Sequence, residues 1–172
     1  MRTAALLQSV WAMGFLLLSS PMAAAQADVG GAKDHPLLTR YPKSHIVEYE
    51  KNFNSVEFAT STKNGEPMRE RREGDATILT YFHNSVDNQP SALQVIRNYQ
   101  NAIMSIGGEV GYERLPKEGD GGETTLKVTT VGKEVWVRLE IGIFSAPTQS
   151  YKLWIVEVAA MQQVVSANKL LD

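Results

Sequence analysis

Apolar side chains recur at steps of three and four between Pro90 and Gly107. The repeat comprises Ala92, Val95, Ile96, Tyr99, Ala102, Ile103 and Ile106. This period places the side chains on one stripe of an α-helix. Pro90 suits the first helical turn, and either Asn88 or Ser91 could cap it. Gly107 can adopt the conformation that closes a helix. We therefore expect one main helix at about 90–107, with its apolar stripe covered by a sheet.

Most other segments after residue 44 alternate between apolar and polar residues, as half-buried strands do. The pattern predicts strands near 45–50, 55–60, 76–83, 109–114, 124–130, 135–144 and 151–158. Asn64-Gly65 predicts a tight turn, because both residues tolerate positive φ. The last strand is apolar on both faces, so we place it centrally in the sheet.

The segment 68–73 alternates arginine with glutamate and has two interpretations. It could form an anion-binding patch, or it could be a solvated edge strand whose charges deter association with other strands. We prefer the edge strand, because the acids between the arginines cancel most of the positive field.

Together these patterns indicate an α+β fold in a single domain over residues 45–160. We expect a mostly antiparallel β-sheet of about six to eight strands packed against the main helix. Residues 161–172 predict a short C-terminal helix as a tail. Residues 28–44 contain two prolines and a glycine pair, so we expect an extended lead-in that lies over the domain.

Residues 1–27 have the features of a secretory signal peptide. Arg2 supplies a positive start, an apolar run follows, and Ala25-Gln26-Ala27 offers small residues at the positions that a signal peptidase reads. We expect cleavage after Ala27, or alternatively near Ala23-Ala24-Ala25. The apolar run is shorter than the roughly 20 residues of a spanning helix, so we expect no transmembrane span in the mature protein.

Composition and charge exclude several classes of function. The chain has 172 residues, of which 43% are hydrophobic and 21% charged, as in ordinary globular proteins. Its net charge of −2 becomes −3 when the signal is removed, because Arg2 is the only charged residue there, and this leaves 16 bases and 19 acids. We therefore expect no nucleic-acid partner. Cysteine is absent, which excludes disulfides, thiolate catalysis, iron–sulfur clusters and a lipoprotein anchor.

Few residues have the spacing that catalysis or metal binding requires. The three histidines, His35, His45 and His83, form no zinc-binding pattern, and no Gly-x-Ser-x-Gly elbow occurs. We expect no cofactor and no metal, and we name no catalytic residue. An alternative stays open, in which the protein is a small hydrolase or metal-dependent enzyme that uses one of these histidines with nearby acids.

Three stretches resemble one known family. They are Gly-Ala-Lys-Asp-His-Pro-Leu-Leu at 31–38 with Arg40-Tyr41-Pro42 and Ile46-Val47, the passage from Arg97-Asn98-Tyr99 through Gly107 to Val110, and the strand from Tyr151 to Met161. They are similar to an uncharacterised exported domain of Gram-negative bacteria that usually precedes an OmpA-type peptidoglycan-binding domain. The resemblance implies an envelope location and a binding or structural role. This sequence ends at Asp172 without that second domain, so peptidoglycan binding is not supported.

These observations predict a non-enzymatic envelope protein that is exported to the periplasm, or alternatively secreted, and that contacts another envelope protein. The best surface for recognition is formed by Asp34, His35, Arg40 and Tyr41, because this segment departs from regular structure and mixes charge with aromatic character. The same residues could instead be a packed lead-in without a partner. A carrier of a small apolar ligand, held between the helix and the sheet, is a further alternative.

Overall fold

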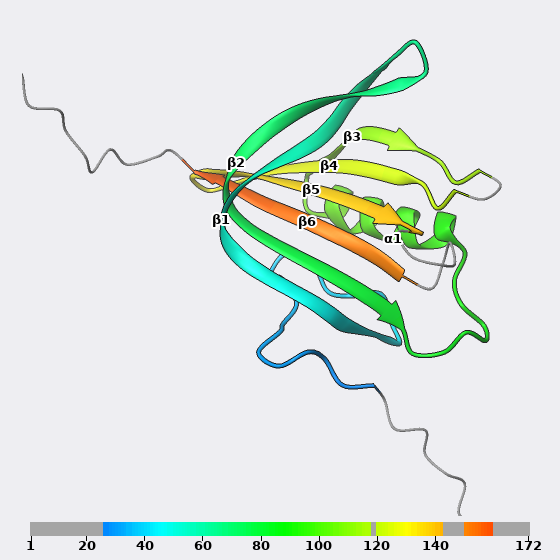
Figure 1. Cartoon of the computed structure of the whole chain (residues 1–172). Helices are drawn as coiled ribbons and strands as arrows, with labels where there is room; N and C mark the ends of the chain where they lie inside the picture. The colour runs from blue at the N-terminus through cyan, green and yellow to red at the C-terminus, as the bar shows by residue number, and fades with distance from the viewer. Residues whose placement is uncertain (1–25, 118–119, 143–149, 160–172) are drawn as a thin grey trace, which may run out of the picture.

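The computed structural model describes residues 26–117, 120–142 and 150–159, which form one antiparallel six-stranded sheet with one helix against it (Figure 1). The spatial order of the strands is β1-β2-β6-β5-β4-β3. The elements are β1 (Ser44–Lys63), β2 (Glu66–His83), α1 (Ala92–Ser105), β3 (Glu109–Arg114), β4 (Glu123–Thr130), β5 (Lys133–Ile141) and β6 (Ser150–Ala159). The α+β prediction is confirmed at this level, and β6 lies centrally, as expected. The predicted C-terminal helix lies outside the described residues.

Helix α1 begins later than predicted. Ser91 is its N-cap and forms a capping box with Gln94, so Pro90 lies outside the helix rather than in its first turn. Gly107, at φ 85°, ends the helix as expected, and the Gly108 N–H donates to the Ile103 carbonyl.

The buried stripe of α1 also differs from the prediction at three positions. Ala102 is exposed because it falls at the margin of the stripe, and Ile106 is half exposed because it is the C-cap, where the chain leaves the helix. Gln100 is 1% exposed and takes a buried position, although it is polar.

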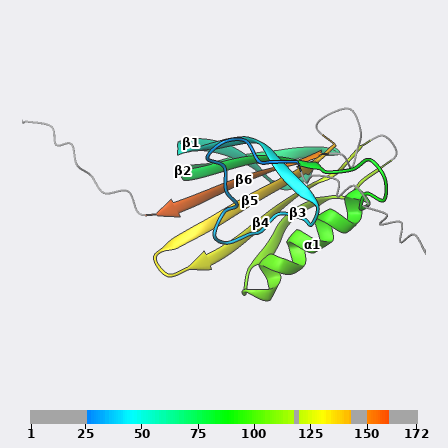
Figure 2. The ribbon, with the colours of Figure 1, turned by 90° about the horizontal axis from the view of Figure 1, so that it is seen from below.

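One face of the sheet is covered jointly by α1 and by the lead-in, which crosses the sheet beside the helix (Figure 2). The core on this face combines helix residues such as Ile96 and Ile103 with every second residue of the central strands. The sheet residues are Ile46, Leu79, Tyr81, Leu126, Val128, Val135, Val137, Leu139, Ile141, Tyr151, Leu153 and Ile155. Leu38 anchors the lead-in in this core at 4% exposure. These side chains fill the space between helix and sheet.

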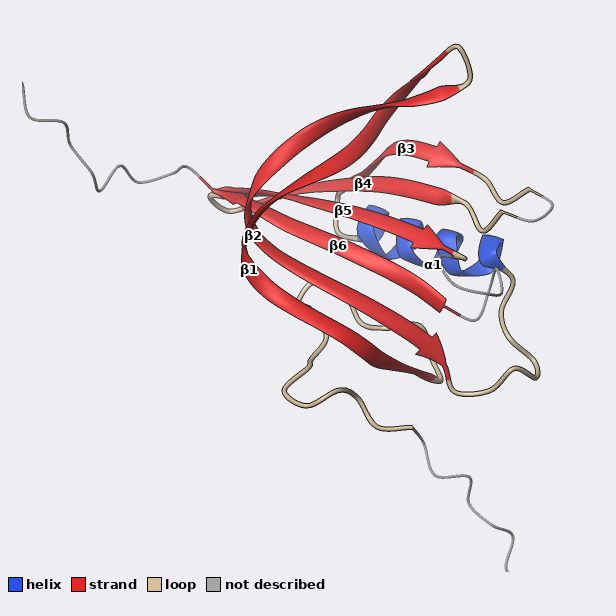
Figure 3. Ribbon diagram, in the orientation of Figure 1, coloured by secondary structure: helices blue, strands red, loops and turns tan. Residues whose placement is uncertain are grey.

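Strands β1 and β2 form a long hairpin whose far half arches over the opposite face (Figures 1 and 3). Phe58 of this arch packs against Trp136, and Val56 and Val156 join the same second core. The turn is Asn64-Gly65, with φ 54° and 85°, as the sequence predicts. The strands predicted at 45–50 and 55–60 are both β-structure, but the break between them is wrong: β1 is continuous, with irregularities of register after Ile46 and Ala59.

The charged segment 68–73 lies in the arch, where β1 is the only one of the described strands that pairs with β2. It is therefore an edge, as predicted, but not all of it is solvated. Arg69 reaches Glu123 with two hydrogen bonds of 2.8 Å, and the Arg72 guanidinium lies 4.2 Å from the Trp136 ring centre. Two of the three arginines thus hold the arch onto the sheet.

Candidate functional site

Two of the predicted surface residues pair with each other. The Arg40 guanidinium donates to Asp28 at 2.6 and 2.8 Å, and its Nε lies 3.0 Å from Asp34 Oδ2. The Tyr81 hydroxyl donates to Asp34 at 2.8 Å. Hydrogen bonding from Arg40 lowers the pKa of Asp28. This network fastens the start of the lead-in to β2.

His35 fastens the lead-in to β6. Its Nδ1 accepts from the Leu37 N–H at 3.2 Å, so Nε2 carries the proton and donates to Glu157 at 3.1 Å. Lys133 also contacts the Glu157 carboxylate. The ring is 8% exposed, and burial lowers its pKa. His35 is therefore held neutral within the protein.

Tyr41 lies at the end of the lead-in, over a group of aromatic side chains. Its N–H donates to the Tyr151 hydroxyl at 2.8 Å, and the Tyr151 ring stacks on Tyr81 at 4.8 Å between ring centres. The Tyr99 hydroxyl of α1 lies 3.4 Å from the same Tyr151 oxygen. Burial raises the pKa of Tyr151 to about 12, which keeps the hydroxyl protonated. Of the four predicted surface residues, Tyr41 is the one that also lines the cleft described below.

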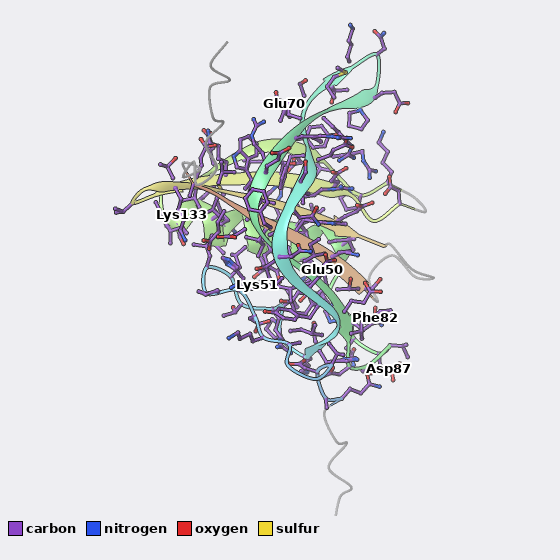
Figure 4. All side chains as sticks on the ribbon, turned by 60° about the vertical axis from the view of Figure 1, so that its left-hand side comes forward. Glu50, Lys51, Glu70, Phe82, Asp87 and Lys133 are labelled. Carbon is purple, nitrogen blue, oxygen red and sulfur yellow. The ribbon has the colours of Figure 1, made fainter. Side chains whose placement is uncertain are left out.

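A cleft of about 830 Å³ opens where the lead-in, the end of β2 and the start of α1 meet. Figure 4 labels Phe82 and Asp87 at this end of the molecule, with Lys133 at the other. The Asn84 N–H donates to the Lys43 carbonyl at 2.8 Å, which brings the lead-in against the linker that follows β2. The lining residues are Tyr41, Pro42, Lys43, His83, Asn84, Ser85, Asp87, Asn88, Gln89, Pro90 and Gln94.

The described residues that line the cleft combine polar side chains with the apolar surface of Tyr41, Pro42 and Pro90. Among them, Lys43 and Asp87 are the only ones with a fixed charge, and they have opposite signs. The Gln94 side chain accepts from the Ser91 N–H at 2.8 Å, and the Gln89 amide donates to the Ser85 carbonyl at 3.0 Å. Asn88 is held at φ 56° with its side chain exposed. The lining thus offers amide groups that both donate and accept hydrogen bonds.

Two histidines lie beside the cleft, and within the described ranges neither is hydrogen-bonded to an acid. His83 Nδ1 is 3.2 Å from Ser44 Oγ, and the Lys43 backbone also hydrogen-bonds to the His83 ring. His45 Nδ1 is 2.8 Å from the side-chain oxygen of Asn84. In a Ser–His–Asp hydrolase an acid orients the histidine, and among the described residues the Ser44–His83 pair has no hydrogen-bonded acid. In the same part of the chain, no three His, Cys, Asp or Glu side chains cluster as metal ligands do.

No protein-family model matches this chain, and the search of curated proteins returned no significant match. Within the described residues, no helix has the length and apolar character to cross a membrane. The resemblance to an OmpA-associated domain stays a prediction.

The sequence gives little sign of the cleft. Residues 84–90 form a polar linker between a strand and a helix, which is common in any protein. Their importance depends on pairing with Lys43, some forty residues earlier, and no local pattern reports that pairing. The nearest signal was Tyr41-Pro42, an aromatic residue beside a proline in the segment already chosen as a candidate surface.

Proposed function

We propose that this chain is an exported, periplasmic binding protein without a catalytic centre, and that the Tyr41–Gln94 cleft is its ligand site. The observation that carries the proposal is the cleft itself: it has a volume of about 830 Å³, is formed by three separate segments, and is lined by polar side chains together with Tyr41, Pro42 and Pro90. Ligand sites in proteins commonly fall in this size range and combine a rigid frame with a few hydrogen-bonding groups. The signal-like segment 1–27 supports export.

The packing favours this site over the two alternatives. An apolar ligand carrier needs an empty chamber, whereas buried side chains fill the space between α1 and the sheet. A hydrolase needs a histidine that contacts a nucleophile and is oriented by a further side chain, whereas among the described residues His83 contacts Ser44 without a hydrogen-bonded acid, and His45 is hydrogen-bonded to Asn84 but to no nucleophile. His35 does face an acid, but it is buried under the lead-in and its second nitrogen is occupied by Leu37.

Export is tested by expressing the full chain in a Gram-negative host, separating periplasm from cytoplasm, and measuring the mass of the recovered protein. We expect a periplasmic product that begins at Asp28. Cleavage there leaves the Asp28 carboxylate in place to bind Arg40 and the Ile46 N–H. A cytoplasmic product that retains residues 1–27 would contradict this part of the proposal.

Binding at the cleft is tested by following backbone amide signals by NMR while classes of small metabolites are added to the mature chain. A true ligand should shift amides of the linker 84–90 in a saturable way. Asn88→Gly, which removes a cleft side chain but keeps the positive φ available, should weaken binding. Asn64→Gly is the matched control, because Asn64 has a similar φ of 54° at the distant hairpin turn. Equal effects of both variants would argue against the cleft.

A further inference from the structure

The chemistry of the cleft narrows the class of ligand, and this inference rests on the function proposed above. We infer that the cleft binds a neutral, hydroxyl-rich ligand, namely a short oligosaccharide. Four features carry the inference: the balance of charge, the type of hydrogen-bonding group, the aromatic wall and the rigidity of the frame.

The balance of charge disfavours ligands with a net charge. Lys43 and Asp87 are both exposed and carry opposite charges, so the net fixed charge of the described lining residues is zero. An anionic ligand in a protein site is usually met by arginine or several cations. Arg40 is the nearest arginine in the lead-in, and its donors are committed to Asp28 and Asp34.

The polar groups of the lining match hydroxyl groups. A hydroxyl both donates and accepts, and so does a primary amide. Asn88 in the linker and Gln94 in α1 each supply a side-chain amide, and Ser85 supplies a hydroxyl. The Gln94 side chain uses its oxygen in the helix cap, which leaves its amide N–H groups as donors. Such a set can satisfy several hydroxyls of one ligand without any charge.

Tyr41 supplies an aromatic wall. Its ring meets His83 edge-on, with 5.8 Å between centres and an angle of 82° between the planes. The Tyr41 N–H donates to the Tyr151 hydroxyl, and the side chain packs against the edge of the core, so both contacts hold the residue in place without a ligand. Aromatic rings offer a large apolar surface at low entropic cost, and the C–H face of a sugar ring can pack on such a surface.

The frame around the cleft is already rigid. Pro42 and Pro90 restrict the backbone on two sides, the Lys43–Asn84 hydrogen bond joins lead-in to linker, and the capping box fixes the start of α1. Little conformational entropy is lost when such a site is occupied. Because this entropic cost is small, a neutral ligand that forms few strong contacts can still bind with measurable affinity.

The test is an NMR titration of the mature chain with three separate probes: the neutral sugar chitotriose, the zwitterion Ala-Ala, and citrate. We expect chitotriose to shift the amides of residues 84–90 saturably. Tyr41→Leu and Asn88→Gly should each weaken its affinity by about tenfold, the effect of losing one good contact. Asn64→Gly should leave the affinity unchanged. Melting curves of each variant establish that it is folded, and Tyr41→Phe, which retains the ring, should bind as the wild type does.

The outcomes separate this inference from the proposed function. Saturable shifts of the cleft amides by Ala-Ala or citrate, but not by chitotriose, would overturn the carbohydrate assignment and leave the cleft as a ligand site. Chitotriose binding that shifts only amides far from the cleft would overturn both. If no probe shifts the cleft amides, the carbohydrate assignment fails, and a wider metabolite panel that also leaves them unmoved contradicts the proposed function.

Discussion

His35 joins the lead-in to β6 through one neutral ring. Its Nδ1 accepts from the lead-in and its Nε2–H donates to Glu157 of β6, so a second proton would remove the acceptor that Leu37 N–H requires. Burial lowers the pKa of His35 from the ordinary value of 6.5, despite the opposing attraction of Glu157. The ring must therefore stay uncharged for the lead-in to remain in place.

This arrangement predicts that stability falls as the solution becomes mildly acidic. Below pH 6.5 the unfolded chain takes up a proton on histidine while the folded protein does not, so the free energy of unfolding decreases. The slope is at most about 1.4 kcal/mol per pH unit for each such histidine. Burial also lowers the pKa of His83, so both residues contribute. Urea unfolding at pH 7.5, 6.5 and 5.5 measures the effect.

His35→Gln should reduce this pH dependence, and the double variant with His83→Gln should reduce it further. Both variants should also be less stable than the wild type at pH 7.5, because contacts of the histidines are lost. A variant whose stability falls between pH 6.5 and 5.5 as steeply as the wild type would contradict the assignment to these two rings.

Glu123 is the most deeply buried acid described in the structure, at 2% exposure. Arg69 of the arch donates to both of its oxygens, and Arg138 Nε lies 2.9 Å from one of them. The carboxylate therefore depends on two guanidinium groups that come from different strands. It links the arch of the hairpin to the sheet beneath.

Glu123→Ala should destabilise the protein by about 2–4 kcal/mol, because the partly buried Arg69 would lose its carboxylate partner and Arg138 would keep only that of Glu140. Glu57→Ala is the matched control, since Glu57 pairs with Arg71 on the exposed side of the hairpin and should change stability by less than about 1 kcal/mol. Thermal and urea unfolding measure both. Equal losses would mean that the arch is not held by Glu123.

At the scale of elements, Gly74 lies between the charged segment 68–73 and the strand predicted near 76–83, which the structure joins in β2. A Cβ at this position would lie 2.2 Å from the Glu157 carbonyl oxygen, so only glycine lets β2 pass so close to β6. Gly74-Asp75 resembles a turn in the sequence, whereas in the structure it is the point at which the arch begins to leave β6.

Gly74→Ala should therefore destabilise the protein by about 2–3 kcal/mol or prevent folding, as overpacking against backbone does. Gly111→Ala in β3 is the control, because a Cβ there would be 3.7 Å or more from its neighbours. We expect the control to fold with nearly unchanged stability. Unfolding curves of the two variants decide the matter, and an unaffected Gly74→Ala variant would contradict the close approach of β2 and β6.

Elements governed by neighbours in the sequence could be predicted, and those governed by distant partners could not. The helix stripe, the Asn64-Gly65 turn and the alternation in β5 are local patterns, and the structure confirms them. The continuity of β1 and β2 depends on each pairing with the other, and the burial of Gln100 depends on Thr124 and Glu113, which accept from its amide. Neither Thr124 nor Glu113 can be identified as a partner of Gln100 from residues 90–107 alone.

At the scale of the whole molecule, the lead-in decides where a ligand could bind. It shares one face of the sheet with α1 (Figure 2). Its end at Tyr41–Lys43 forms one side of the cleft. The sequence predicted that this segment lies over the domain, and it drew attention to Tyr41. It could not predict the cleft. The other side of the cleft is formed by the polar linker 84–90, which the hydrogen bond between Asn84 and Lys43 brings against the lead-in.

The central claim is that the Tyr41–Gln94 cleft is the ligand site of this protein. The most direct test is a crystal structure of the mature chain soaked with chitotriose, in a lattice that leaves the cleft open. We expect electron density for the sugar against the Tyr41 ring, with the sugar hydroxyls within hydrogen-bond distance of Asn88 and Gln94. An empty cleft under conditions where chitotriose binds in solution, or density on another surface, would contradict it.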